Sequence, residues 1–138
     1  MKKYTLIEHT ADIGIKVKAK DLKKLFKNAA GAMFEIIAER RDLKAIKQEK
    51  TKIEQKADNI EELFINWLNE LLSLSATKEI IFSDFKIDRL EEDNLEATVI
   101  GGNIKNYKVN TEIKAATYHQ LEIKKVPSGW EAKVIFDV

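Results

Sequence analysis

The segment DNIEELFINWLNELL, residues 58–72, carries the clearest structural pattern in this 138-residue chain. Asp58, followed three residues later by Glu61, resembles a capping box, which predicts that a helix begins there. The apolar residues of the segment recur at helical spacing and form one stripe: Ile60, Leu63, Phe64, Trp67, Leu68, Leu71 and Leu72. Such a stripe is typical of a helix that buries one face in a core, so we interpret it as structural and not as a cofactor-binding motif.

Another amphipathic helix is predicted nearer the start of the chain. Asp21 fits the N-cap position, and apolar residues at helical spacing follow it for about four turns. Directly before it, residues 13–18 alternate between apolar and polar or small side chains, which predicts a strand with one buried face. Residues 4–7 predict a further strand, and the loop between the two strands holds His9 and Asp12.

The rest of the chain is predicted to be mainly β structure. Segment 44–57 is polar and suits either an edge strand or a charged helix, and we favour the strand because residues 51–53 alternate in polarity. Two hairpins are expected after the helix; their strands are residues 79–87, 94–100, 119–126 and 130–138. The pair Gly101–Gly102 is expected to break the strand pattern before an irregular or bent stretch at 103–118.

These elements together predict a single α+β domain over residues 1–138. Its expected architecture is a mostly antiparallel mixed β-sheet packed by two amphipathic helices. The chain has 24 Lys and Arg against 23 Asp and Glu, a formal net charge of +1. This balance argues against nucleic-acid binding by bulk electrostatics, although it leaves room for a local basic patch.

The composition also narrows the chemistry that the chain can perform. Cysteine is absent, which excludes a disulfide, a thiolate nucleophile and a cysteine-rich zinc site, and there are only two histidines. No segment is apolar enough to cross a membrane and no signal-peptide pattern is present, so a cytoplasmic protein is expected. The sequence contains no phosphate-binding loop and no nucleophile elbow.

The stretch YTLIEHTADIGI, residues 4–15, is the first candidate for a functional site, because a histidine and an aspartate interrupt two apolar runs. A second aspartate, Asp137, follows an apolar run near the other end of the chain. If that last strand lies beside the first ones, Asp12, Asp137 and the carboxylate of Val138 provide oxygen ligands for a hard cation such as calcium or magnesium. Without a cation, like-charge repulsion would favour protonation of one carboxyl group.

Each candidate also has a plainer interpretation. Asp12 can simply shape a turn, and Asp137 can be an exposed charge. His9 is interpreted as a hydrogen-bonded anchor of its loop. In an alternating strand, His119 falls on the same face as two aliphatic residues downstream, which predicts a buried structural histidine. Lys114 falls on the opposite face and is interpreted either as a solvated side chain or as an anion contact.

Five motifs, in order along almost the whole chain, resemble the archease family. They are HTADIGI at 9–15, LFKNAAGAM at 25–33, WLNELL at 67–72, EIKAATYH at 112–119 and the final FDV at 136–138. The resemblance implies a protein cofactor, not an enzyme, that activates the RtcB-type tRNA-splicing ligase. That ligase uses GTP and manganese and forms a guanylylated histidine, and archease would promote this guanylylation and multiple turnover. The chain would meet tRNA only indirectly, through the ligase.

The resemblance also implies a divalent-metal site. Its ligands map onto Asp12 and Asp137, with Val138 supplying an oxygen, and calcium is the expected ion, with manganese or magnesium as alternatives. His9, Lys114 and His119 would support this site or contact the partner. The stretch 101–110 departs from the family pattern because it lacks an acidic residue and a histidine, which leaves its role open.

Two other function classes remain as alternatives. The first is a metal-dependent small phosphohydrolase that uses the two aspartates, although the motifs offer no clear general base or nucleophile beside them. The second is a chaperone-like adaptor of RNA-processing enzymes.

Overall fold

The computed structural model describes residues 4–8, 12–42 and 44–138. The strands near the N-terminus are β1 (Tyr4–Glu8) and β2 (Asp12–Ala19), and helix α1 (Leu22–Ile37) leads into β3 (Ala38–Arg40) and β4 (Gln48–Lys56). Helix α2 (Ile60–Lys78) follows, and then β5 (Ile80–Leu90) and β6 (Asn94–Asn103). A short 3₁₀ turn, η1 (Ile104–Asn106), precedes β7 (Tyr107–Val109), β8 (Ala115–Val126) and β9 (Gly129–Asp137).

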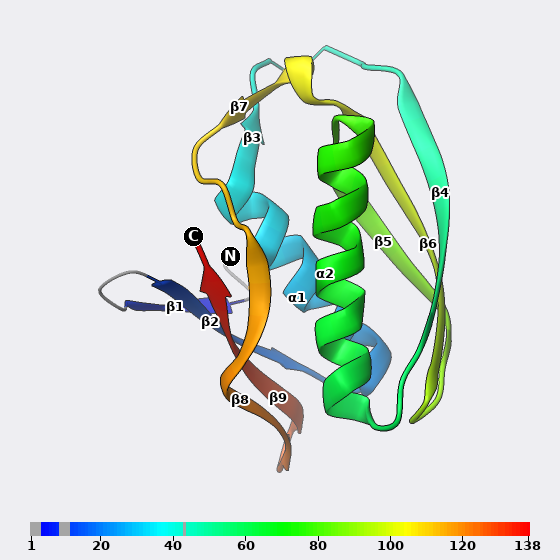
Figure 1. Ribbon diagram of the computed structural model, residues 1–138, viewed down its shortest axis with the longest axis vertical. Helices are drawn as coiled ribbons and strands as arrows, with labels where there is room; N and C mark the ends of the chain where they lie inside the picture. Colours follow the sequence, from blue (N-terminus) through cyan, green and yellow to red (C-terminus); the bar gives the residue numbers. More distant parts are fainter. Residues whose placement is uncertain (1–3, 9–11, 43) are drawn as a thin grey trace.

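In the described part of the chain, the strands lie in three antiparallel sheets with the helices between them (Figure 1). The four-stranded sheet has the order β1-β2-β9-β8, the three-stranded sheet has the order β4-β6-β5, and β3 pairs with β7. The prediction of an α+β fold with antiparallel strands and two helices is confirmed, and the strands are divided among several sheets. Over the described residues, no helix is both long and apolar enough to cross a membrane.

The helix starts show how local signals set the element boundaries. The side chain of Asp21 accepts a hydrogen bond from the backbone N–H of Lys24 at 2.8 Å, as predicted for an N-cap. The predicted start of α2 was wrong by one residue. The N-cap is Asn59, whose side-chain oxygen accepts from the N–H of Glu62 at 2.9 Å, because an asparagine caps a helix as well as an aspartate does.

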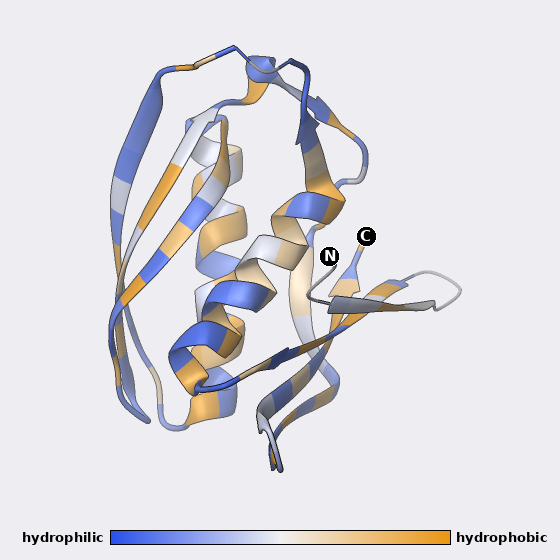
Figure 2. Cartoon of the chain, turned by 180° about the vertical axis from the view of Figure 1, so that it is seen from behind, coloured by the Kyte–Doolittle hydropathy of each residue, from blue (hydrophilic) through white to orange (hydrophobic). Residues whose placement is uncertain are grey.

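The apolar faces of both helices meet in the core, as Figure 2 shows in the hydropathy of their inward sides. Trp67 of α2 is fully buried, and its indole Nε1–H donates to the carbonyl oxygen of Phe26 on α1 at 3.0 Å. The rings of Phe26 and Phe64 pack edge to face with centroids 5.0 Å apart. The interpretation of the apolar stripe in 58–72 as core is therefore confirmed.

The two predicted hairpins and the strand in segment 44–57 are all present. The expected break at the glycine pair is wrong, because both glycines lie within β6. A Cβ on Gly101 would lie 2.4 Å from the carbonyl oxygen of Ile81, so glycine allows the neighbouring strand to approach closely instead of ending the strand.

Candidate metal centre

Asp12 and Asp137 stand directly opposite each other at one end of the four-stranded sheet. Asp12 is the first residue of β2 and Asp137 the last of β9, and the antiparallel register pairs their Cα atoms. Directly paired residues point to the same face of a sheet, with Cβ atoms about 4.5–5.5 Å apart. The fold thus brings together two carboxylates from opposite ends of the sequence.

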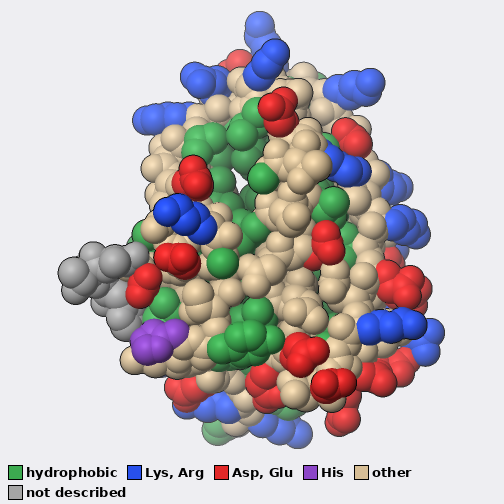
Figure 3. Space-filling model, in the orientation of Figure 1, with side chains coloured by type: hydrophobic (Ala, Val, Ile, Leu, Met, Phe, Trp, Pro, Cys, Tyr) green, Lys and Arg blue, Asp and Glu red, His purple; other side chains and the backbone are tan. Residues whose placement is uncertain are grey.

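On its other side, β9 pairs with β8 next to Asp137. Ala115 of β8 pairs with Asp137, and the backbone N–H of Lys114 donates to the carbonyl oxygen of Asp137 at 2.8 Å. Asp137 is therefore held by a strand on each side, although its side chain is exposed. Acidic side chains lie at the molecular surface in this region, where β9 ends (Figure 3).

The donor set of this pair fits a hard cation. Carboxylate oxygens are the ligands that calcium and magnesium prefer, and two aspartates at this spacing can contact one ion. Like charges placed directly opposite on neighbouring strands destabilise a sheet, so a cation between them would remove a repulsion. Within the described ranges, no group of three or more histidine, cysteine or acidic side chains is arranged to hold a metal. The pair would need other oxygen ligands, from Val138, water or a partner.

The remaining predicted site residues are placed differently. His9 lies outside the described residues. Val138 is 36% exposed, and the side chain of Lys114 is exposed while its backbone joins the sheet. The prediction that His119 is buried is wrong, since its side chain is exposed.

A bulge in β8 explains the error at His119. Thr117 pairs with Ile135 and Glu122 pairs with Lys133, so four residues of β8, 118–121, stand opposite one residue of β9. Side chains alternate between the two faces of a strand, so an odd number of extra residues exchanges the faces beyond the bulge. The face of His119 therefore cannot be predicted by counting alternate residues through the bulge. Gln120 within it has φ 53°, a left-handed conformation that is rare for a side-chain-bearing residue.

Asn69 of α2, which was not among the predicted site residues, fixes β8 beside the aspartate pair. Its amide nitrogen donates to the carbonyl oxygen of Ala116 at 3.1 Å, and its amide oxygen accepts from the N–H of Ala116 at 2.8 Å. Ala116 follows Ala115, the partner of Asp137. A polar residue among the leucines of WLNELL was the available signal, but its target could not be read from the helix alone.

Two tyrosines near the four-stranded sheet have perturbed acidity. Partial burial raises the pKa of the Tyr4 phenol, and the nearby carboxylate of Glu35 raises it further. Partial burial also raises the pKa of Tyr118, in the β8 bulge, and the negative charge of Glu62 on α2 adds to the effect. Both phenols therefore stay neutral to a higher pH than an isolated tyrosine.

Comparisons with known proteins agree over almost the whole chain. The model of the archease protein family matches residues 4–138. The archease of Methanosarcina barkeri is 38% identical over 144 residues, which cover 99% of this chain and 97% of that protein. The archease of Pyrococcus abyssi is 34% identical, with both chains covered fully.

Two solved structures share the fold. A solution structure of a Methanobacterium thermoautotrophicum protein aligns with a TM-score of 0.76 and 31% identity over 100% of both chains. A crystal structure from Thermotoga maritima, described as an archease and possible chaperone, aligns with a TM-score of 0.69 and 26% identity. That alignment covers 96% of this chain and 94% of the Thermotoga chain.

Proposed function

Because the chain belongs to the archease family, we propose that it activates an RtcB-type tRNA-splicing ligase as a protein cofactor. The observation that carries this proposal is the cross-strand pair of Asp12 and Asp137 at the end of the four-stranded sheet. The chain would promote guanylylation and multiple turnover of the ligase without joining RNA itself. It would act in the cytoplasm.

The aspartate pair is proposed to bind a divalent cation, with an oxygen of Val138 as a third protein ligand. Calcium is the first choice because it accepts six to eight oxygen ligands in flexible geometry, and manganese or magnesium are the alternatives. The exposed position of Asp137 supports this assignment, since water or side chains of the ligase can complete the coordination shell.

The mechanism follows from the charge of this end of the sheet. If this acidic tip entered the nucleotide-binding cleft of the ligase, Asp12 and Asp137 would hold a cation there, and the cation would supply charge stabilisation for reaction at the α-phosphate. Lys114 and His119 are exposed and would contact the ligase beside the pair, and His9, which precedes β2 in the sequence, would support the site.

The test is multiple-turnover ligation by the cognate ligase, measured with and without the chain. Asp12→Asn and Asp137→Asn keep the size of each side chain and remove its charge, so each is expected to abolish stimulation. Asp93→Asn removes an exposed carboxylate from the turn between β5 and β6 and is expected to stimulate normally. Full stimulation by both Asp12→Asn and Asp137→Asn would contradict the proposal.

The same samples separate the alternatives. Phosphatase activity of the chain alone, lost in the two asparagine variants, would favour the phosphohydrolase. The description of the Thermotoga relative as a possible chaperone makes the adaptor alternative worth testing. Suppression of ligase aggregation without any change in guanylylation rate would favour that alternative.

A further inference from the structure

The lysines at the start of α1 oppose its helix dipole, although the N-cap residue Asp21 complements it. Lys23 and Lys24 lie in the first turn of α1, which contains no acidic residue. Cations there repel the positive end of the dipole, so this arrangement costs stability. Helix α2 has the usual arrangement, with Glu61 and Glu62 in its first turn. The start of α1 thus carries a positive charge that helix formation does not require.

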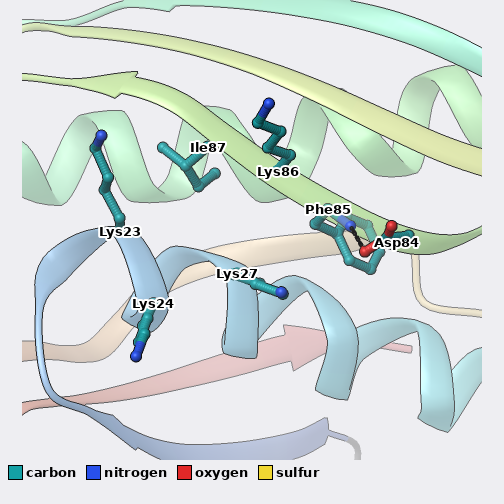
Figure 4. A pocket seen from close by; sticks show the side chains of 7 residues that line it. All are labelled: Lys23, Lys24, Lys27, Asp84, Phe85, Lys86 and Ile87. Atoms are coloured by element: carbon teal, nitrogen blue, oxygen red, sulfur yellow. Dashed lines mark hydrogen bonds between the residues drawn. The ribbon is translucent and has the colours of Figure 1, made fainter.

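These lysines line a groove between α1 and β5. Lys23, Lys24 and Lys27 come from the helix, and Asp84, Phe85, Lys86 and Ile87 come from the strand (Figure 4). The groove has a volume of about 330 Å³. We call these four lysines, 23, 24, 27 and 86, the lysine groove.

The positive charge of the lysine groove is poorly neutralised. Across the described ranges, Lys23, Lys24 and Lys27 have no acidic partner within 4.0 Å. Lys86 contacts Asp88 at 3.7 Å. The one carboxylate that lines the groove, Asp84, accepts a hydrogen bond from the backbone N–H of Phe85 at 3.0 Å. In a chain with a net charge of only +1, this is a local excess of positive charge.

The directions of the side chains indicate the shape of the ligand. Figure 4 shows the four ammonium groups pointing apart around the groove and not toward a common centre. Such an arrangement suits negative charges spaced along a polymer better than one compact anion. Lysine ammonium groups neutralise phosphates as point charges, and no arginine lines this groove to grip one anion through two parallel hydrogen bonds.

The groove also lacks a surface for base stacking. Its aromatic residue, Phe85, is 3% exposed and packs in the core against Phe34 and Trp67. Proteins that bind single strands usually stack bases on exposed aromatic rings. Recognition of a duplex, in contrast, relies mostly on shape and on contacts to phosphates and sugars.

We propose that the lysine groove binds the phosphodiester backbone of double-stranded RNA. The choice of RNA rests on the proposed function, which places the chain beside an RNA ligase; the choice of a duplex backbone rests on the groove. Helix α1, which supplies three of the lysines, begins just after the end of β2 that is opposite Asp12, and a strand of that length spans about 23 Å. One chain would hold a structured RNA while its acidic tip contacts the ligase.

The test measures binding of the full chain to a fluorescently labelled RNA hairpin stem at several salt concentrations, without ligase. Three to four phosphate contacts predict that affinity falls about 40- to 150-fold between 50 and 200 mM salt. The triple variant Lys23→Gln/Lys24→Gln/Lys27→Gln is expected to lower the salt slope by about three units, and Lys86→Gln by about one. The Lys86 variant shows whether β5 contributes as well as the helix.

A matched control removes the same charge elsewhere. Lys50, Lys52 and Lys56 are exposed on β4, outside the groove, and their triple glutamine variant is expected to retain the native salt slope. Equal losses in both triple variants would show binding by net charge and overturn the proposal. Equal binding to an unpaired RNA strand, or equal competition by polyglutamate, would also overturn it.

Two sets of variants separate RNA binding by the lysine groove from activation of the ligase by the aspartate pair. Asp12→Asn and Asp137→Asn are expected to bind the stem as the native chain does, although they fail to stimulate ligation. Conversely, the triple groove variant keeps the aspartate pair and is expected to bind calcium normally. Thermal melting shows that each variant is folded, and relief of the dipole repulsion is expected to raise the melting temperature of the groove variant.

Discussion

Asn69 satisfies both backbone hydrogen-bonding groups of Ala116, one through each end of its side-chain amide. Among the strands that the structure describes, β8 lies at an edge of the four-stranded sheet, so one row of its backbone groups has no strand to pair with. Helix α2 covers this edge, and Asn69 supplies a donor and an acceptor where the strand needs them. The aspartate pair is aligned by the same strand through Ala115.

Replacing Asn69 with alanine is expected to lower the free energy of unfolding by about 1–3 kcal/mol, because it leaves a backbone donor and acceptor of β8 without partners. Urea unfolding measures the change. Asn66→Ala is the matched control on the same helix, since the side chain of Asn66 donates a long, exposed hydrogen bond to the carbonyl oxygen of Lys56 at 3.4 Å. Equal losses from both substitutions would contradict the assigned role.

Calcium is expected to raise the melting temperature of the native chain, because a ligand that binds only the folded state stabilises it. Asp137→Asn should weaken calcium binding by more than about tenfold, since it removes one of two charged ligands. In the presence of a chelator, the same variant should melt no lower than the native chain because a like-charge repulsion is gone. Calorimetric titration and thermal melting check the two parts, and unchanged calcium affinity would refute the site.

Lys24→Glu is expected to raise the free energy of unfolding by about 0.3–1 kcal/mol at low salt, because it reverses an unfavourable charge in the first turn of α1. High salt should remove most of the gain. Lys27→Glu serves as the comparison, since Lys27 lies beyond the first turn, where the field of the helix end is weaker. Denaturant unfolding at two ionic strengths distinguishes the two positions.

Two glycine-to-alanine changes are expected to have opposite effects. Gly101→Ala places a methyl group 2.4 Å from the carbonyl oxygen of Ile81 and should destabilise the chain by about 1–3 kcal/mol. Gly31→Ala, within α1, has nothing within 4 Å of the new methyl group and should stabilise by about 0.5–1 kcal/mol. Denaturant unfolding of both variants provides the test; stabilisation by Gly101→Ala would show that the strands can move apart.

Alkaline pH is expected to destabilise the fold through Tyr4. Its pKa in the folded chain is raised by burial and by Glu35, so the folded state holds the phenol proton more tightly than the unfolded state. This contribution to stability is complete below about pH 10, the ordinary tyrosine value, and is lost as pH rises through the raised pKa. Tyr4→Phe should reduce the loss of stability above pH 10, as measured by unfolding across that range.

Features of the fold that depend on residues close together in the sequence were predictable. Asp21 and the alternating strand after Asp12 are local signals, and both elements were found where expected. The N-cap of α2 lies one residue later than predicted, because Asp58 and Asn59 are nearly equivalent as capping residues. The bulge that exposes His119 was not predictable, since the left-handed turn falls at Gln120, where no glycine marks it.

The candidate sites depend on pairings across the chain. Strand periodicity placed Asp12 and Asp137 near strand ends, but only the pairing of β2 with β9 sets them opposite each other. The lysine groove needs α1 to lie against β5, a contact that no local pattern of Lys23 or Lys86 reveals. The role of Asn69 likewise depends on which strand α2 covers.

The pairing of β2 with β9 has a consequence for how the protein is made. These strands come from the two ends of the sequence, so closing them together costs the entropy of a loop that contains both helices. Contacts of such wide sequence separation slow folding, and this sheet is expected to form only after β9 has been synthesised. The aspartate pair therefore cannot form before β9 has been made, and translation products that stop short of Asp137 cannot compete for whatever the pair binds.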